Sequence, residues 1–285
     1  MHEEIEKGYE LCASATKEAA STFYYAFHTL PPNKRRAIYA VYHLCRMCDD
    51  IVDDSGATEK KKLQLNHLRK QFFALNDTGT SEPSIIALKH TCALFEIPLE
   101  YFEQLLTGVG MDLENRRYER FEDLYQYCYK VASVVGLICI KIFGYQDKLA
   151  KQFAIDMGIA MQLTNILRDI KEDAEKGRIY IPASDMKTFG YTERDLLRHV
   201  NDQAFRNMMA FNVQRAKSYF DKSLSLFPLL NDDSRLCSQA LHMTYSKLLD
   251  KIERSKYDIF RKRISLSKIE RIGLIVKLKL FKAKF

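Results

Sequence analysis

Two pairs of aspartates, each pair spaced four residues apart, are the strongest chemical signal in the sequence. The first pair is Asp49 and Asp53, and the second is Asp169 and Asp173. Four residues make about one turn of an α-helix, so each pair stacks its carboxylates on one face. Stacked like charges cost a few tenths of a kcal/mol unless a cation offsets them. Mg²⁺ prefers a few carboxylates together with phosphate oxygens, so the pairs predict metal ions that hold a diphosphate.

A helical wheel extends each aspartate pair into a polar stripe within an apolar segment. Apolar residues surround both stripes, which favours the lining of a cavity over a solvated face rich in Lys and Glu. Two ordinary exposed acidic faces are the alternative, because a single motif of this kind often arises by chance. The first stripe contains Tyr42, Arg46, Asp49 and Asp53, and the second contains Gln162, Asn165, Asp169 and Asp173.

The elements that must position these stripes are helices. Apolar residues recur at three- and four-residue spacing through almost the whole chain, and no strand–turn–strand pattern interrupts them, so an all-α fold is predicted. In helical bundles, sites are built from side chains on facing helices, so the two aspartate helices should face each other across one cavity. The predicted helices cover residues 3–19, 34–54, 59–75, 84–95, 99–113, 121–142, 147–173, 202–226, 234–257 and 267–283.

Composition indicates one domain in a reducing compartment. The chain has 285 residues, 47% of them hydrophobic, which is enough for a sizeable core. Its seven Cys residues are odd in number and scattered, which favours reduced thiols and a cytoplasmic protein. The polar N-terminus carries no signal-peptide pattern. The longest apolar stretch, residues 131–143, is too short to span a bilayer and is expected to be a buried helix.

The positive charge is concentrated at the C-terminal end. Residues 251–285 hold 12 Lys or Arg and 3 Asp or Glu, a balance of +9, which leaves −2 for the rest given the total of +7. Residues 265–285 alternate apolar clusters with Lys, a pattern that suits contact with an anionic membrane surface. A docked helix with a solvated Lys face is the alternative. No recognised motif accompanies the charge, so nucleic-acid binding is not expected.

The chain resembles the squalene/phytoene synthase family of head-to-head prenyl-diphosphate synthases from about residue 21 to about residue 263. Residues 42–53, YHLCRMCDDIVD, are similar to the first aspartate-rich motif, and residues 158–173 to the second. Between them, residues 127–136, YCYKVASVVG, resemble the central YC-x-x-VA motif. The downstream R-x-Y-x-P motif is matched by residues 178–182. The resemblance implies a single-domain, isoprenoid-synthase-type helical bundle around a central cavity, over residues 1–264, followed by the basic segment 265–285.

The resemblance also implies the roles of the site residues. The metal ligands would be Asp49, Asp53, Asn165, Asp169 and Asp173, holding about two or three Mg²⁺ ions that promote departure of diphosphate. The four aspartates together with Tyr127 would form the catalytic set. The substrate-binding set would be Ser21, Phe23, Phe27, Tyr42, Arg46, Asp112, Val131, Gln162, Asn165, Arg168 and Tyr245.

Within the substrate-binding set, the arginines would donate charge-assisted bonds to phosphate oxygens, and the aromatic rings would stabilise carbocations through their π faces. Ordinary aromatic core packing is the alternative for the rings. Asp112 matches the acidic position before the central motif, with a structural acid at a helix end as its alternative. The sequence departs from the family's Ser-x-Ser-Phe at residues 20–23, where Ala20 removes one hydroxyl; Ser21 is then expected to supply the phosphate contact.

The product predicted from this resemblance is dehydrosqualene, made from two farnesyl diphosphates through presqualene diphosphate, as in C30 carotenoid biosynthesis. No dinucleotide or Walker motif is present, so NADPH is not expected. Phytoene from two geranylgeranyl diphosphates and NADPH-dependent squalene are the alternatives.

Two further alternatives lie outside this reaction. A catalytically silent, membrane-associated assembly protein would have lost carboxylates from one motif, whereas all four are present. A class I terpene cyclase also pairs acidic motifs but would lack the central motif. The expected location is the cytoplasm, with peripheral contact at the inner face of the membrane through residues 265–285.

Overall fold

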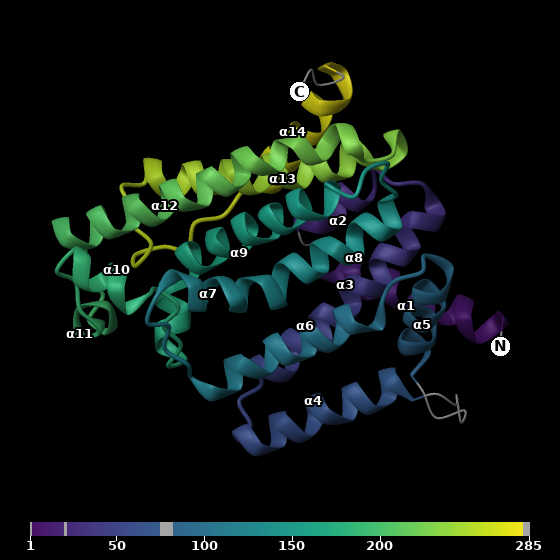
Figure 1. The fold of residues 1–285 in the computed structure, drawn as a ribbon, viewed down its shortest axis with the longest axis horizontal. Coiled ribbons are helices and arrows are strands. Elements are labelled where there is room, and N and C mark those ends of the chain that lie inside the picture. The colour runs from purple at the N-terminus through teal and green to yellow at the C-terminus, as the bar shows by residue number, and fades with distance from the viewer. Residues whose placement is uncertain (1, 20–21, 75–81, 282–285) are drawn as a thin grey trace.

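The computed structural model describes residues 2–19, 22–74 and 82–281, and they are organised almost entirely as helices (Figure 1). No strand occurs within these ranges, where one isolated bridge pairs Tyr145 with Leu230. The predicted all-α class is confirmed. The α-helices are α1 (His2–Glu18), α2 (Thr22–Phe27), α3 (Pro32–Asp53), α4 (Thr58–Phe73), α5 (Pro83–Leu94), α6 (Leu99–Met111), α7 (Phe121–Cys128), α8 (Val134–Phe143), α9 (Ala150–Glu175), α10 (Ala183–Thr188), α11 (Glu193–Leu197), α12 (Gln203–Ser223), α13 (Asp232–Arg254) and α14 (Lys268–Phe281).

Three shorter helical segments connect these elements. A 3₁₀ turn, η1 (Asp112–Glu114), follows α6, and another, η3 (Leu224–Leu229), follows α12. A π-helical turn, η2 (Tyr129–Ser133), joins α7 to α8. Each of the ten predicted segments corresponds to a helix, with three corrections. The short helices α2, α10 and α11 were not predicted, residues 129–133 are not α-helical, and α12 gives way to η3 before residue 226.

Local sequence explains where the two aspartate helices begin and end. α3 begins at Pro32, directly after Pro31. Proline is favoured at the first position of a helix, because the backbone N–H that it lacks would have no hydrogen-bond partner within the helix there. At the other end of the site, α9 stops at Glu175 and Gly177 follows with a φ of 78°. Glycine adopts this left-handed conformation without a Cβ clash, so the chain turns back directly after Asp173.

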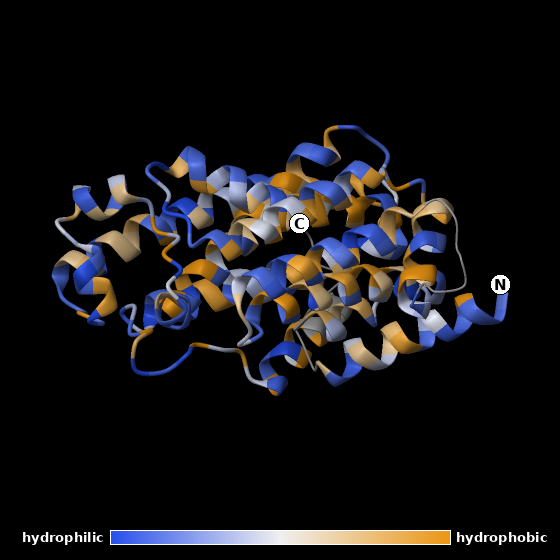
Figure 2. Cartoon of the chain, turned by 90° about the horizontal axis from the view of Figure 1, so that it is seen from below, coloured by the Kyte–Doolittle hydropathy of each residue, from blue (hydrophilic) through white to orange (hydrophobic). Residues whose placement is uncertain are grey.

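The two aspartate helices lie in the interior of the bundle. α3 packs against α1, α5 and α8, whereas α9 packs against α8, α12 and α13. Figure 1 shows α9 between the α12–α13 layer and the layer of α3 and α8. Individual helices carry hydrophilic residues on one side and hydrophobic residues on the other, as Figure 2 shows, which is the amphipathic pattern read from the sequence. Two buried apolar clusters meet at the partly buried Phe23, Tyr129, Ile155 and Met161.

The π turn η2 and α9 approach each other very closely. A Cβ placed on Gly158 would lie 2.5 Å from the Cα of Ser133, so only glycine fits there. The Ser133 hydroxyl donates to the carbonyl of Ile155 on α9 at 2.9 Å. π-helical turns often occur at functional sites. Here the turn presses residues 127–136 against the second aspartate helix.

The most apolar stretch of the chain is part of this interior. The residues Phe121–Phe143 would be long and apolar enough to cross a membrane, but half of their most apolar window is buried in the protein. Val134, Ile138 and Ile140 in this stretch are at most 2% exposed. The stretch is therefore a core element, as predicted for residues 131–143.

Candidate active site

Both aspartate pairs line a single cavity of about 200 Å³. The C-terminal part of α3 contributes Asp49 and Asp53, and α9 contributes Asp169 and Asp173. Asp112, at the junction of α6 and η1, adds a fifth carboxylate to the same cavity. The prediction that the two helices face each other across one cavity is confirmed. Five carboxylates around so small a space require cations to offset their mutual repulsion.

Asp53 is neutralised from across the cavity. Its Oδ1 atom lies 3.0 Å from the ammonium of Lys176 and 3.1 Å from a guanidinium nitrogen of Arg178. Arg178 also donates to the carbonyl of Val52 at 3.2 Å, which ties the segment after α9 to the end of α3. Burial acts to raise the pKa of Asp53, but the two cations outweigh it and hold that pKa below its ordinary value.

Asp169 forms ion pairs with two arginines. Arg263, in the segment between α13 and α14, donates to both carboxylate oxygens at 2.8 and 3.1 Å. Arg168 also forms a bidentate pair with the same carboxylate. Burial again acts to raise the pKa of Asp169, and the guanidiniums overcome it and hold that pKa below its ordinary value.

The other carboxylate of each pair lacks such neutralisation. Burial raises the pKa of Asp49 to about 6, although Arg46 opposes the shift from 3.5 Å and the neighbouring carboxylates reinforce it. Burial likewise raises the pKa of Asp173 to about 7, with the Asp169 carboxylate adding to the shift. Asp53 and Asp169 therefore have the closer cationic partners, while Asp49 and Asp173, whose pKa values are raised, would gain more from an added cation.

Two tyrosines hold the fifth carboxylate in place. Tyr180 donates to one oxygen of Asp112 at 2.7 Å, and Tyr127 donates to the other at 3.0 Å. The two rings stack with centroids 5.1 Å apart. Burial raises the pKa of Asp112 above its ordinary value, and burial also raises the pKa of Tyr127 well above its ordinary value. This network joins the central motif to the R-x-Y-x-P motif.

The donor set suits Mg²⁺ that arrives with a diphosphate. The Oδ1 atom of Asn165 is buried on the cavity wall and has no hydrogen-bond partner. Within the described ranges, no three acidic, His or Cys side chains converge tightly enough to hold an ion alone. Mg²⁺ commonly binds through one or two carboxylates plus substrate phosphates rather than in a cage made only of protein. The residues therefore fit a metal whose remaining ligands come from the substrate.

An apolar cavity of about 280 Å³ adjoins the carboxylates. Asp49, Gln162 and Asn165 line both cavities, so the two adjoin at these side chains. Ile38 and Phe143 also line this cavity. Ile38 is eleven residues from Asp49 on α3 and Phe143 is the last residue of α8, twelve residues after Val131, so helix geometry places both at the end away from the carboxylates. A carboxylate-rich head and an apolar body are the two environments that a prenyl diphosphate requires.

An aromatic cluster lies where the polar and apolar parts meet. The ring centroid of Phe23 lies 5.6 Å from that of Tyr42, 5.8 Å from that of Phe27 and 5.9 Å from that of Tyr245. These separations are typical of aromatic packing in cores. All four rings also line the apolar cavity, so packing and substrate contact are compatible roles for them.

A wider opening of about 460 Å³ leads from the surface to this junction. Arg46 and Arg168 line this opening, and each pairs with an aspartate of the carboxylate cavity, Asp49 and Asp169 respectively. Val131, on the π turn, lines both inner cavities as expected. Ser21 lies outside the described residues.

Four polar side chains of the site were missing from the predicted set: Lys176, Arg178, Tyr180 and Arg263. The R-x-Y-x-P motif already pointed to Arg178 and Tyr180, both of which line the carboxylate cavity. Arg263 carries no local signal, because its partner Asp169 lies 94 residues earlier in the chain.

Comparison with known proteins gives one consistent relationship. The family model described as squalene/phytoene synthase matches residues 16–270. The 15-cis-phytoene synthase of Synechocystis sp. is 36% identical over 271 residues, covering 91% of this chain and 80% of that protein. The crystal structure of a dehydrosqualene synthase in complex with ligand superposes with a TM-score of 0.90 at 29% identity, covering 99% of both chains. The squalene synthase HpnC from Alicyclobacillus acidocaldarius gives 0.79 at 28% identity, covering 89% and 96%.

Proposed function

The protein belongs to the squalene/phytoene synthase family of head-to-head prenyltransferases, and from this premise we propose that it condenses two farnesyl diphosphates to dehydrosqualene. The first half-reaction joins the two chains into presqualene diphosphate and releases one diphosphate and one proton. The second releases the other diphosphate, and a proton is lost to give the C30 hydrocarbon. No reductant enters this balance, so no NADPH is required.

The observation that carries the proposal is the joining of five carboxylates to an apolar cavity through shared lining residues. Bound Mg²⁺ would supply charge neutralisation of the departing diphosphate. About two or three ions would be held by Asp49, Asp53, Asn165, Asp169 and Asp173. Members of this family generally use a divalent metal with their diphosphate substrates.

The basic side chains around the carboxylates would receive the diphosphate oxygens. Lys176 and Arg178 lie against Asp53, and Arg263 lies against Asp169. Charge-assisted bonds from guanidinium to phosphate are short and strong, and Arg can make two at once. These cations would position the leaving group while the prenyl tail extends into the apolar cavity. The rings of Phe23 and Tyr42 would then flank the reacting carbons.

The separation along α3 of two residues that line the apolar cavity supports a C15 tail. Asp49 and Ile38 are eleven residues apart on α3, so the helix places them about 16 Å apart. Three bonds of an extended chain cover about 3.6 Å, so a four-bond isoprene unit covers about 5 Å. A farnesyl chain of three units is then about 15 Å long and fits, whereas the four units of a geranylgeranyl chain need about 20 Å.

Phytoene synthesis from two geranylgeranyl diphosphates is the second candidate. It is favoured by the names of the sequence relatives, among them the phytoene synthase of Mycobacterium tuberculosis at 34% identity. The two candidates differ in the length of the apolar cavity that each requires, and not in the chemistry of the carboxylates.

Product analysis tests the proposal. Purified protein would be incubated with Mg²⁺ and with farnesyl or geranylgeranyl diphosphate, each with and without NADPH. Dehydrosqualene from farnesyl diphosphate without NADPH is the expected result. A C40 product would transfer the assignment to phytoene synthesis, and squalene formed only with NADPH would contradict the proton-loss step. Absence of any hydrocarbon would favour a silent relative.

The cellular location and the domain boundary at residue 264 remain predictions. We retain the expectation of a cytoplasmic enzyme with peripheral membrane contact. Fractionation of cells that express the full chain would test it, and recovery of all the protein in the soluble fraction at low salt would contradict the membrane contact.

A further inference from the structure

The C-terminal helix α14 presents an apolar face to solvent. Ile269, Ile272 and Val276 are 83%, 42% and 46% exposed. Residues at positions i, i+3 and i+7 fall on one side of a helix, so the three side chains form a continuous stripe. Contiguous exposed apolar surface marks an interaction site more often than scattered single residues do.

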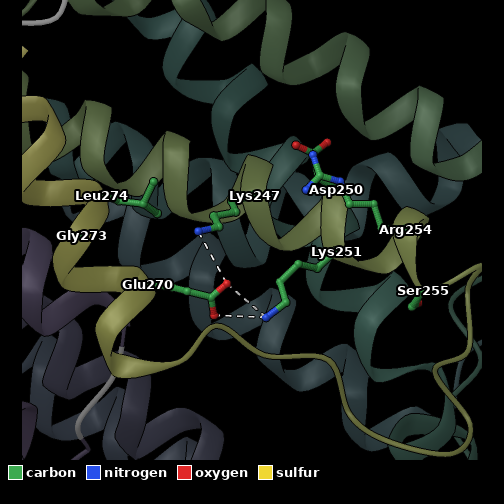
Figure 3. A pocket seen from close by; sticks show the side chains of 8 residues that line it. All are labelled: Lys247, Asp250, Lys251, Arg254, Ser255, Glu270, Gly273 and Leu274. Atoms are coloured by element: carbon green, nitrogen blue, oxygen red, sulfur yellow. Dashed lines mark hydrogen bonds and ion pairs between the residues drawn. The ribbon is translucent and has the colours of Figure 1, made fainter.

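The opposite side of α14 is fixed to the body of the protein. Glu270 pairs with Lys251 at 3.1 Å and with Lys247 at 3.6 Å, as Figure 3 shows. The helix packs on α13 and α2, which carry the Tyr245, Phe23 and Phe27 of the aromatic cluster. α14 is therefore docked, as one of the sequence-based alternatives expected, and its exposed side carries the apolar Ile269, Ile272 and Val276.

The charge around α14 identifies its partner. The pocket of about 750 Å³ lined by Lys247, Lys251 and Glu270 lies on the docked side, where Glu270 already pairs with both lysines. On the solvent side, Lys268 is exposed and Arg261, in the segment before α14, is 89% exposed. The sequence of α14 itself holds four basic residues and one acidic residue. An apolar stripe bordered by positive charge matches an anionic bilayer surface. A second copy of this chain would bring the same positive charge against it and is disfavoured.

We propose that α14 lies in the surface of an anionic membrane and sets the opening of the active site against the lipid. Arg271 of α14 and Leu266 just before it line the 460 Å³ opening, together with Leu248 of α13. A helix that lies in the interface therefore borders the route to the aromatic cluster. Prenyl tails and the hydrocarbon product pass between bilayer and cavity with little exposure of apolar surface to water. This passage rests on the proposed function, whereas the docking of α14 does not.

The chain contains no Trp, which gives a direct test of docking. Ile272→Trp places the single indole on the exposed face of α14. Leu63→Trp is the matched control, because Leu63 is 70% exposed on α4, on the opposite side of the molecule from α14 in Figure 1. Each variant is mixed with vesicles of phosphatidylglycerol and phosphatidylcholine that carry brominated acyl chains.

The expected result is a blue-shifted, quenched emission for Ile272→Trp and an unchanged emission for Leu63→Trp. Vesicles of phosphatidylcholine alone should quench much less, and added salt should reduce the quenching. An unquenched Ile272→Trp overturns the proposal, and so does equal quenching of both variants. A blue shift that appears with rising protein concentration and without vesicles would assign the face to self-association and overturn it too.

A second measurement tests the passage. Replacing Ile269, Ile272 and Val276 together by Ser should lower vesicle binding by at least about tenfold, because about three buried aliphatic side chains are lost. Turnover without vesicles should stay unchanged, while the severalfold stimulation of the wild type by vesicles should disappear. Stimulation that persists in the triple variant overturns the passage. Quenching of Ile272→Trp together with a wild type that forms no hydrocarbon would overturn the proposed function and leave docking supported.

Discussion

Shortening the side chain at the closed end of the apolar cavity should change the length of the accepted substrate. Phe143 is the last residue of α8, is 3% exposed and lines the far end of that cavity. Its ring contains six carbons, one more than an isoprene unit. Phe143→Ala therefore opens room for most of the additional unit of a geranylgeranyl chain.

The size of the effect follows from the surface that becomes buried. Burying five further carbons is worth up to about 4 kcal/mol at roughly 0.8 kcal/mol per methylene, or about a thousandfold in specificity. Imperfect fit reduces this, so we expect kcat/KM for geranylgeranyl relative to farnesyl diphosphate to rise by at least about a hundredfold. The substitution should also cost about 3–5 kcal/mol of folding free energy, so assays belong at low temperature.

A matched control separates cavity length from loss of stability. Phe220 is also 3% exposed, on α12, and lines neither inner cavity. Phe220→Ala should therefore lower the melting temperature similarly without changing the product. The assay supplies both diphosphates in equal amounts and measures C30 and C40 hydrocarbons by mass spectrometry. An unchanged ratio in Phe143→Ala, at a comparable loss of stability, would refute the placement of the closed end.

Three further predictions concern the carboxylates and the close approach of helices. Asp49→Asn should abolish Mg²⁺-dependent turnover and leave the circular dichroism spectrum unchanged. The control Asp50→Asn, at an exposed neighbour paired with Arg46, should retain turnover. Near-normal turnover of Asp49→Asn would refute its assignment as a metal ligand. In EDTA, Asp173→Asn should be more stable than wild type above about pH 7. Burial raises the pKa of Asp173 in the folded wild type to about 7. As pH rises from the ordinary pKa of an aspartate to this raised pKa, the free energy of unfolding of the wild type falls by about 2–4 kcal/mol, because the folded state resists ionisation of Asp173. Melting curves of the two proteins that coincide from pH 4 to pH 8 would contradict this. Gly158→Ala should unfold the protein at a markedly lower temperature, because its Cβ would meet backbone at 2.5 Å, whereas Gly273→Ala has open space and should be neutral.

The sequence was most informative where periodicity and motifs coincide. Both aspartate helices were predicted, and so was the cavity between them, because a polar stripe on a helix packed among apolar neighbours is stable only where it lines a polar space. The short helices α2, α10 and α11 escaped prediction, because six or five residues are too few to establish a helical period.

Features that depend on contacts distant in sequence could not be predicted. The π turn at residues 129–133 exists beside Gly158, and neither segment alone signals it. The pairing of Arg263 with Asp169 joins residues 94 apart in sequence and depends on how the chain returns after α13. The apolar character of the exposed face of α14 likewise required knowing which side of that helix meets α13.

The ion pairs of Asp53 and Asp169 bear on the order in which ligands enter the site. Each of these carboxylates already holds a cation before any substrate arrives. A metal that came alone and bound Asp53 or Asp169 would have to displace Lys176 or Arg263 and leave that charge without a partner. A metal that comes with a diphosphate lets the displaced cation transfer to a phosphate oxygen, so the exchange conserves charge pairing. Calorimetry should accordingly find weak heats for Mg²⁺ alone and strong, cooperative heats when inorganic diphosphate is present.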